Sequence, residues 1–122
     1  MAQHIWVIED DDSIAEVMQL VLEQEGYEVH VSTNYAVERE IIATWPQPAL
    51  ILLDVLMSGS DGREVAKELR AQSHLASIPM FFVSANIAIE KRAQEAGVNG
   101  YLRKPFNIDD LISLVRDNAI EA

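Results

Sequence analysis

The sequence contains no cysteine among its 122 residues. Without thiols the chain forms no disulfide, thiolate zinc site, iron–sulfur cluster or cysteine nucleophile. Basic residues are also few, because 9 Lys and Arg stand against 20 Asp and Glu, for a formal net charge of −11. Nucleic acids and anionic membranes attract basic surfaces, so we expect this domain to bind neither directly.

Long apolar runs are absent as well. The apolar runs are too short to span a membrane, and the first residues lack the basic start of a secretory signal. We therefore expect a cytoplasmic protein. At 49% hydrophobic residues, with no repeat or long linker, the chain is expected to form one domain over residues 1–122 with its own core.

Short apolar segments alternate five times with amphipathic ones. The expected strands are Ile5–Ile8, Glu28–Val31, Leu50–Leu53, Met80–Val83 and Gly100–Leu102. The strongest of them are apolar on both faces, which is typical of parallel strands covered by helices on both sides. Right-handed crossovers then predict a doubly wound α/β fold with a five-stranded parallel sheet of order 2-1-3-4-5.

Each expected helix shows an apolar stripe or a capping residue. Ser13 and Glu16 resemble a capping box for the first helix, although Asp11 and Asp12 are also interpreted as capping residues. Asp61 and Asn107 are expected to cap the third and fifth helices. The expected inward-facing residues, helix by helix, are Ile14, Val17, Met18, Val21 and Leu22; Val37, Ile41 and Trp45; Val65, Ala66 and Leu69; Ile89, Ala93 and Ala96; Ile108, Leu111, Ile112, Val115 and Ala119.

Polar side chains follow four strands that are neighbours in the predicted order. They are Glu9 and Asp10, then Asp54, then Ser84, then Lys104. Ligands of open α/β sheets bind beyond the carboxyl ends of the strands, so these side chains are expected to share one crevice. Asp54 lies too far before the next helix to serve as its cap, which favours a functional role.

Three carboxylates in one crevice need positive charge. Two carboxylates about 4 Å apart repel by about 4 kcal/mol at an effective dielectric constant near 20. Lys104 balances one of them, and an all-oxygen site favours Mg²⁺, or Mn²⁺, for the rest. A carboxylate, a hard cation, a hydroxyl and a lysine together indicate phosphoryl transfer to Asp54. The histidines, His4, His30 and His74, are interpreted as scattered surface residues.

The same residues carry a family resemblance. The matching segments are Val7–Asp11, Leu52–Met57, Asp61–Gly62, Val83–Ala85 and Gly100–Phe106. In this order and spacing, the chain resembles the receiver domain of two-component response regulators over nearly its whole length. The resemblance implies a flavodoxin-like (βα)5 fold for residues 1–122.

The resemblance also implies a role for each site residue. Asp54 would be the phosphoacceptor, Ser84 and Lys104 would contact the phosphoryl group, and Tyr101 would be the switch aromatic that follows Ser84. The implied Mg²⁺ ligands are Glu9, Asp10, Asp54 and the backbone carbonyl of Leu56. The phosphoryl donor would be a phosphohistidine on a sensor histidine kinase or a histidine phosphotransfer domain. The domain would catalyse its own phosphorylation and dephosphorylation and no other reaction, and its downstream protein or output domain is not implied.

The chain departs from the family pattern at a few positions. Ser58 stands where proline is usual, and the segment from Ser84 to Lys104 is about two residues shorter than usual. Leu56, two residues after Asp54, cannot position an attacking water, which predicts a long-lived phosphorylated state. Candidate partner contacts near the site are Gly59, Ser60, Ile87, Ile89 and Tyr101.

Three other functions were weighed. A pseudo-receiver would keep the fold and bind a protein constitutively, without phosphorylation. An aspartyl-phosphate hydrolase of the haloacid dehalogenase type needs a second Asp two residues after the nucleophile, where this chain has Leu56. A dinucleotide-binding module needs a glycine-rich loop after the first strand, and none is present.

Overall fold

The computed structural model describes residues 2–57 and 59–120, and Ser58 therefore lies outside the described residues. Five parallel strands form one sheet: β1 (His4–Ile8), β2 (Glu28–Ser32), β3 (Leu50–Asp54), β6 (Met80–Ser84) and β7 (Gly100–Arg103). Their order is β2-β1-β3-β6-β7, which confirms the predicted topology. The fold is the expected doubly wound α/β domain.

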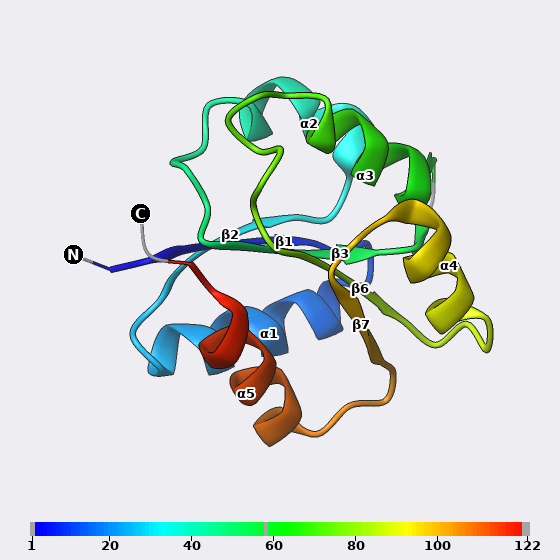
Figure 1. The fold of residues 1–122 in the computed structure, drawn as a ribbon. Helices are drawn as coiled ribbons and strands as arrows, with labels where there is room; N and C mark the ends of the chain where they lie inside the picture. The colour runs from blue at the N-terminus through cyan, green and yellow to red at the C-terminus, as the bar shows by residue number, and fades with distance from the viewer. Residues whose placement is uncertain (1, 58, 121–122) are drawn as a thin grey trace.

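Helices cover both faces of the sheet. In Figure 1, α1 (Asp12–Gln24) and α5 (Ile108–Asn118) lie below the sheet, and α2 (Tyr35–Ile42), α3 (Gly62–Arg70) and α4 (Ile89–Ala96) lie above it. Each face has its own core. Val7 and Leu52 pack towards Leu111 on the α1/α5 side, whereas Trp6 and Phe82 pack on the other side. No helix among residues 2–57 and 59–120 is long and apolar enough to cross a membrane.

The first helix begins at a different cap from the one predicted. The carboxylate Oδ1 of Asp11 accepts a hydrogen bond from the backbone N–H of Ile14 at 3.0 Å, so Asp11 is the N-cap and the Ser13–Glu16 capping box is wrong. Asp11 precedes the helix in extended conformation, where its short carboxylate reaches the unpaired N–H groups of the first turn. Val17 is 44% exposed, so it also lies outside the predicted stripe.

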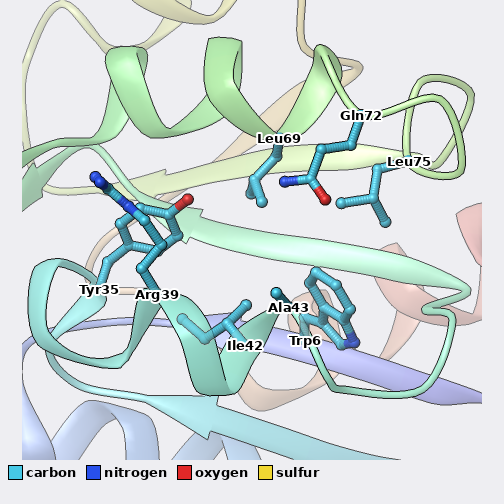
Figure 2. A pocket seen from close by; sticks show the side chains of 8 residues that line it. All are labelled: Trp6, Tyr35, Arg39, Ile42, Ala43, Leu69, Gln72 and Leu75. Carbon is cyan, nitrogen blue, oxygen red and sulfur yellow. The ribbon is translucent and has the colours of Figure 1, made fainter.

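The second helix presents a different face to the core. Val37 and Ile41 are exposed, and the buried residues of α2 are Tyr35 and Ile42. The helix ends at Ile42, three residues before Trp45, and the N–H groups of Thr44 and Trp45 then bond to carbonyls three residues back instead of four. A small cavity of about 50 Å³ remains between α2 and α3 beside Trp6, lined by side chains that include Tyr35, Ile42 and Leu69 (Figure 2).

The remaining helices agree better with the sequence. Asp61 caps α3, as predicted. Asn107 stands at the predicted N-cap position of α5, but its side chain makes no capping hydrogen bond, and Ile108 is 51% exposed. The fourth helix forms despite the shortened segment and ends at Gly97, whose φ of 70° is left-handed. Ile89 is fully buried in this helix, so it packs in the core and is not a partner contact.

Candidate functional site

Asp54 is the last residue of the central strand β3, between β1 and β6. The four residues before it are apolar and buried, and Asp54 itself is only 4% exposed. Glu9 follows the neighbouring strand β1 and is 2% exposed. The parallel register brings both carboxylates to the same end of the sheet. The predicted juxtaposition of strand-end acids is confirmed for these two residues.

Lys104 lies between the two buried carboxylates. Its Nζ is 2.6 Å from Glu9 Oε1 and 3.4 Å from Asp54 Oδ2, and its side chain is 14% exposed. Backbone groups stabilise the other oxygens. The N–H of Leu56 donates to Asp54 Oδ1 at 3.1 Å, and the N–H of Asp11 donates to Glu9 Oε2 at 3.2 Å. The site therefore holds buried negative charge that the Lys104 ammonium contacts closely.

This charge distribution shifts the ionisation of the site. Desolvation, followed by the hydrogen bond and the charge of Glu9, raises the pKa of Asp54 from 3.8 to about 7, against the opposing effect of Lys104. Burial alone would lower the pKa of Lys104, but the neighbouring Glu9 and Asp54 outweigh burial and raise it. Lys104 is therefore charged at neutral pH, while Asp54 is balanced between its two forms.

The acidic cluster suits a hard divalent cation. One carboxylate oxygen from each of Glu9, Asp10 and Asp54 lies within 4.8 Å of the others. Glu9 Oε1 is buried and pairs with Lys104 without a well-aligned hydrogen bond, so it retains capacity to bind a cation. Oxygen donors of this kind are the usual protein ligands of Mg²⁺. A cation here would also relieve the repulsion that raises the pKa of Asp54.

The loop after Asp54 forms one wall of the site. Two short antiparallel strands, β4 (Leu56–Met57) and β5 (Ser60–Asp61), were not predicted from the sequence. With Asp10 and Val55 they line an open depression of about 510 Å³. The side chain of Leu56 is 57% exposed beside Asp54. Asp10 is the member of the acidic cluster that lines this depression, next to the loop that follows Asp54.

Gly62, at the start of α3, holds this loop close to Asp54. Its N–H donates to the carbonyl of Val55 at 2.8 Å. A Cβ on Gly62 would lie 2.2 Å from the carbonyl oxygen of Asp54 and 2.6 Å from Cα of Val55. Since backbone atoms cannot yield as a flexible side chain can, this position requires glycine. The sequence marked Gly62 through the family resemblance but gave no physical reason for it.

The predicted switch residues lie along the neighbouring strands. Ser84 ends β6 and is 2% exposed, and its Oγ accepts a hydrogen bond from the N–H of Asn86 at 3.1 Å. The N–H of Lys104 donates to the carbonyl of Ser84 at 2.9 Å, which ties the end of β6 to the lysine. Tyr101 on β7 is half-buried, with the guanidinium of Arg103 5.7 Å from its ring centre.

Two of the three histidines are not scattered, which corrects the sequence interpretation. His4 Nδ1 lies 2.9 Å from His30 Nε2, and both side chains are half-buried, whereas His74 is exposed. The two histidines lie on β1 and β2, which pair in the sheet. Their separation of 26 residues hid a contact that the predicted strand order alone, without the register between the strands, does not indicate.

Comparison with known proteins agrees with this geometry. The response regulator receiver domain family matches residues 5–116. The DNA-binding dual master transcriptional regulator RpaA of Synechocystis is 32% identical over 114 residues, covering 92% of this chain and 47% of that protein. The chain thus spans about half the length of the curated relatives it matches.

Solved structures give the same result. The chemotaxis response regulator CheY4 of Vibrio cholerae has a TM-score of 0.85 and 26% identity, covering 96% of this chain and 98% of that one. The receiver domain of sensor histidine kinase PA1611 from Pseudomonas aeruginosa has a TM-score of 0.84 and 26% identity, covering 97% and 98%. That structure has a magnesium ion coordinated in the active site cleft. Sequence, fold and site therefore agree that this chain belongs to the response regulator receiver domain family of two-component signalling.

Proposed function

We propose that residues 1–122 form one receiver domain that accepts a phosphoryl group on Asp54. The observation that carries the proposal is the position of Asp54: a buried carboxylate at the end of the central strand, with Glu9 beside it and the Lys104 ammonium at 3.4 Å. A carboxylate with no catalytic or metal-binding role would gain nothing from this environment, because its desolvation opposes folding. In this proposal the donor side chain approaches from the open depression lined by Asp10 and Leu56.

The metal in this proposal is Mg²⁺, and Mn²⁺ can replace it. Glu9, Asp10 and Asp54 would hold it through carboxylate oxygens, with the backbone carbonyl of Leu56 as a further ligand. The proximity of the three carboxylates and the magnesium ion in the related PA1611 receiver domain support this assignment. When bound, Mg²⁺ supplies positive charge that stabilises phosphoryl oxygens during transfer.

The proposed step is an in-line displacement at phosphorus. A carboxylate oxygen of Asp54 forms a new O–P bond while the P–N bond of a phosphohistidine breaks, and the leaving imidazole keeps the electron pair and takes a proton from solvent. Lys104 neutralises charge on the transferred group, and Ser84 donates a hydrogen bond to one of its oxygens. The transfer conserves the phosphoryl group and leaves an acyl phosphate on Asp54.

The donor in this proposal is a sensor histidine kinase or a histidine phosphotransfer domain. The phosphorylated state would be read through Ser84 and Tyr101 by a protein partner or an output domain. The only reactions catalysed would be the phosphorylation and dephosphorylation of the domain itself. Because histidine kinases draw on ATP, the proposed location is the cytoplasm. A ligand shifts such a switch only by its differential affinity for the two states.

Intact-mass measurement tests this proposal. The wild-type chain is incubated with acetyl phosphate and Mg²⁺, beside Asp54→Ala and the matched control Asp61→Ala, which removes an exposed carboxylate nearby. We expect one added phosphoryl group on the wild type and on Asp61→Ala, none on Asp54→Ala, and none after chelation of Mg²⁺. Absence of any adduct, together with failure to bind beryllofluoride, would contradict the proposal and favour a pseudo-receiver.

A further inference from the structure

A second group of metal-binding side chains lies away from the acidic site. His4 is on β1, and Glu28 and His30 are on the edge strand β2. The parallel register pairs His4 with Glu28 and Trp6 with His30. Because side chains alternate between faces along a strand, these residues project from the same face of the sheet. His4 begins β1, whereas Glu9 follows its other end, so the two groups lie at opposite ends of the strand.

The distances within this group fit a shared cation. His4 Nδ1 is 2.9 Å from His30 Nε2 and 3.2 Å from Glu28 Oε2, and one metal-binding atom from each of the three residues lies within 4.8 Å of the others. Ligands of a tetrahedral Zn²⁺ ion with bonds of about 2.0–2.1 Å lie about 3.3 Å apart. His4 Nδ1 therefore lies near metal-ligand spacing from both of its neighbours before any ion is bound.

The available N–H groups cannot satisfy His4, Glu28 and His30 with hydrogen bonds all at once. His4 Nδ1 faces both a carboxylate and a ring nitrogen of His30, and one N–H can donate well to only one of them. A cation among the three atoms would satisfy all of them at once, through two imidazole nitrogens and one carboxylate oxygen.

The surroundings hold the rings in position and leave the group accessible. The His4 and His30 rings stack with centres 5.2 Å apart, and the centre of the Trp45 ring lies 5.6 Å from that of His30. Trp45 in turn packs edge-on against the buried Trp6. The Glu28 side chain is 61% exposed and that of His4 is 26% exposed, so an ion can enter from solvent.

We propose that His4, Glu28 and His30 form a second metal site that binds a divalent transition-metal ion. Two imidazoles and one carboxylate, with water as the fourth ligand, suit Zn²⁺, and Cu²⁺ binds such donors more tightly. Mg²⁺ prefers oxygen ligands alone, so it belongs to the acidic cluster and does not compete here. The bound ion joins the edge strand β2 to β1 and stabilises the folded chain.

Calorimetric titration of the full chain with Zn²⁺ in excess Mg²⁺ tests this site. We expect one Zn²⁺ per chain, and roughly tenfold or greater weakening in His30→Gln and in His4→Gln. The matched control is His74→Gln, which removes an exposed histidine from the loop after α3 and is expected to bind as the wild type does. No Zn²⁺ binding by the wild type, or equal affinity in His30→Gln, would overturn the proposal.

Two further measurements keep the result decisive. Glu28→Gln alters an exposed side chain and leaves the core intact, so it tests the site even if a histidine variant fails to fold. Unchanged Zn²⁺ affinity in Glu28→Gln would overturn the three-residue site. Tryptophan fluorescence reports where the ion binds, because both tryptophans of the chain lie near the histidine pair. Trp45 packs against His30, and Trp6 packs against Trp45. Cu²⁺ should quench the fluorescence in the wild type and in His74→Gln, and quench it far less in His30→Gln. Equal quenching in all three would place the ion elsewhere.

Discussion

Asp54 is a buried carboxylate whose ionisation opposes folding. Its pKa is raised from 3.8 to about 7, first by desolvation and then by Glu9. Because the folded chain holds this proton more tightly than the unfolded chain does, the destabilisation is complete above pH 7. It disappears as the pH falls from about 7 towards 4. The apo site therefore gives up stability at neutral pH in order to hold a reactive, metal-binding carboxylate.

Replacing the charge at Asp54 should therefore stabilise the metal-free protein. We expect Asp54→Asn to raise the free energy of unfolding by about 1–4 kcal/mol at pH 8 in the presence of a chelator. The gain should shrink as the pH falls to 5, and Mg²⁺ should reduce it at pH 8 by stabilising the wild type. Urea unfolding of both proteins at each pH measures the difference. His30, whose pKa is lowered by burial, is common to both proteins, so its contribution cancels.

Leu56 should determine how long a phosphoryl group stays on Asp54. Its exposed side chain lies beside the acceptor and has no polar atom to orient a water molecule for attack at phosphorus. We expect Leu56→Asn to shorten the lifetime of the phosphorylated protein several-fold, measured as loss of the added mass after the donor is removed. Val37→Asn changes another exposed apolar residue, on α2 and away from the site, and should leave the lifetime unchanged. A wild-type lifetime that is short and insensitive to Leu56→Asn would contradict this role.

Helices were predicted in number and approximate position, but their caps and faces were predicted less well. The first helix starts at Asp11 because a carboxylate in extended conformation reaches the N–H of Ile14, a geometry that a run of several capping residues leaves undecided. The face of α2 was wrong because two short turns carry apolar residues on both sides, and tertiary packing chose Tyr35 and Ile42 over Val37 and Ile41.

The cap of α1 gives an element-scale prediction. We expect Asp11→Ala to destabilise the protein by about 1 kcal/mol, because the N–H of Ile14 loses its acceptor. Ser13→Ala, within the same turn, should change the free energy of unfolding by less than about 0.5 kcal/mol. Thermal or urea unfolding compares the two variants. A larger loss of stability in Ser13→Ala than in Asp11→Ala would contradict this assignment and support the capping box of Ser13 and Glu16.

The start of α3 gives a second prediction at the scale of an element. In Gly62→Ala the new Cβ meets the backbone of Asp54 and Val55, so we expect a loss of about 3 kcal/mol or more and weaker phosphorylation. Gly97→Ala provides the comparison, because its added Cβ meets nothing within 4 Å and its φ of 70° costs about 1 kcal/mol. Its phosphorylation should match the wild type. Equal losses of stability in the two variants would show that the close backbone contact at Gly62 does not destabilise Gly62→Ala.

At the scale of the whole molecule, the alternation of apolar strands and helices was enough to predict the architecture. The order β2-β1-β3-β6-β7 follows from crossover rules, and it brings Glu9, Asp54 and Lys104 together as predicted. The contact between His4 and His30 was missed, although it depends on the same order, because finding it requires the register between strands as well. The β4–β5 pair escaped prediction because two-residue strands carry no periodicity.

The molecule thus has a negatively charged site at one end of β1 and a histidine cluster at the other. We propose that, among the 20 acidic residues of the chain, Asp54 is the one that takes the phosphoryl group. Borohydride reduces an acyl phosphate to an alcohol and so converts a phosphorylated aspartate into homoserine. The most direct measurement is therefore peptide mass mapping of the intact chain after phosphorylation and borohydride treatment. We predict homoserine at position 54 alone; homoserine at Asp10 or Asp61, or none with phosphorylation verified, would contradict the account.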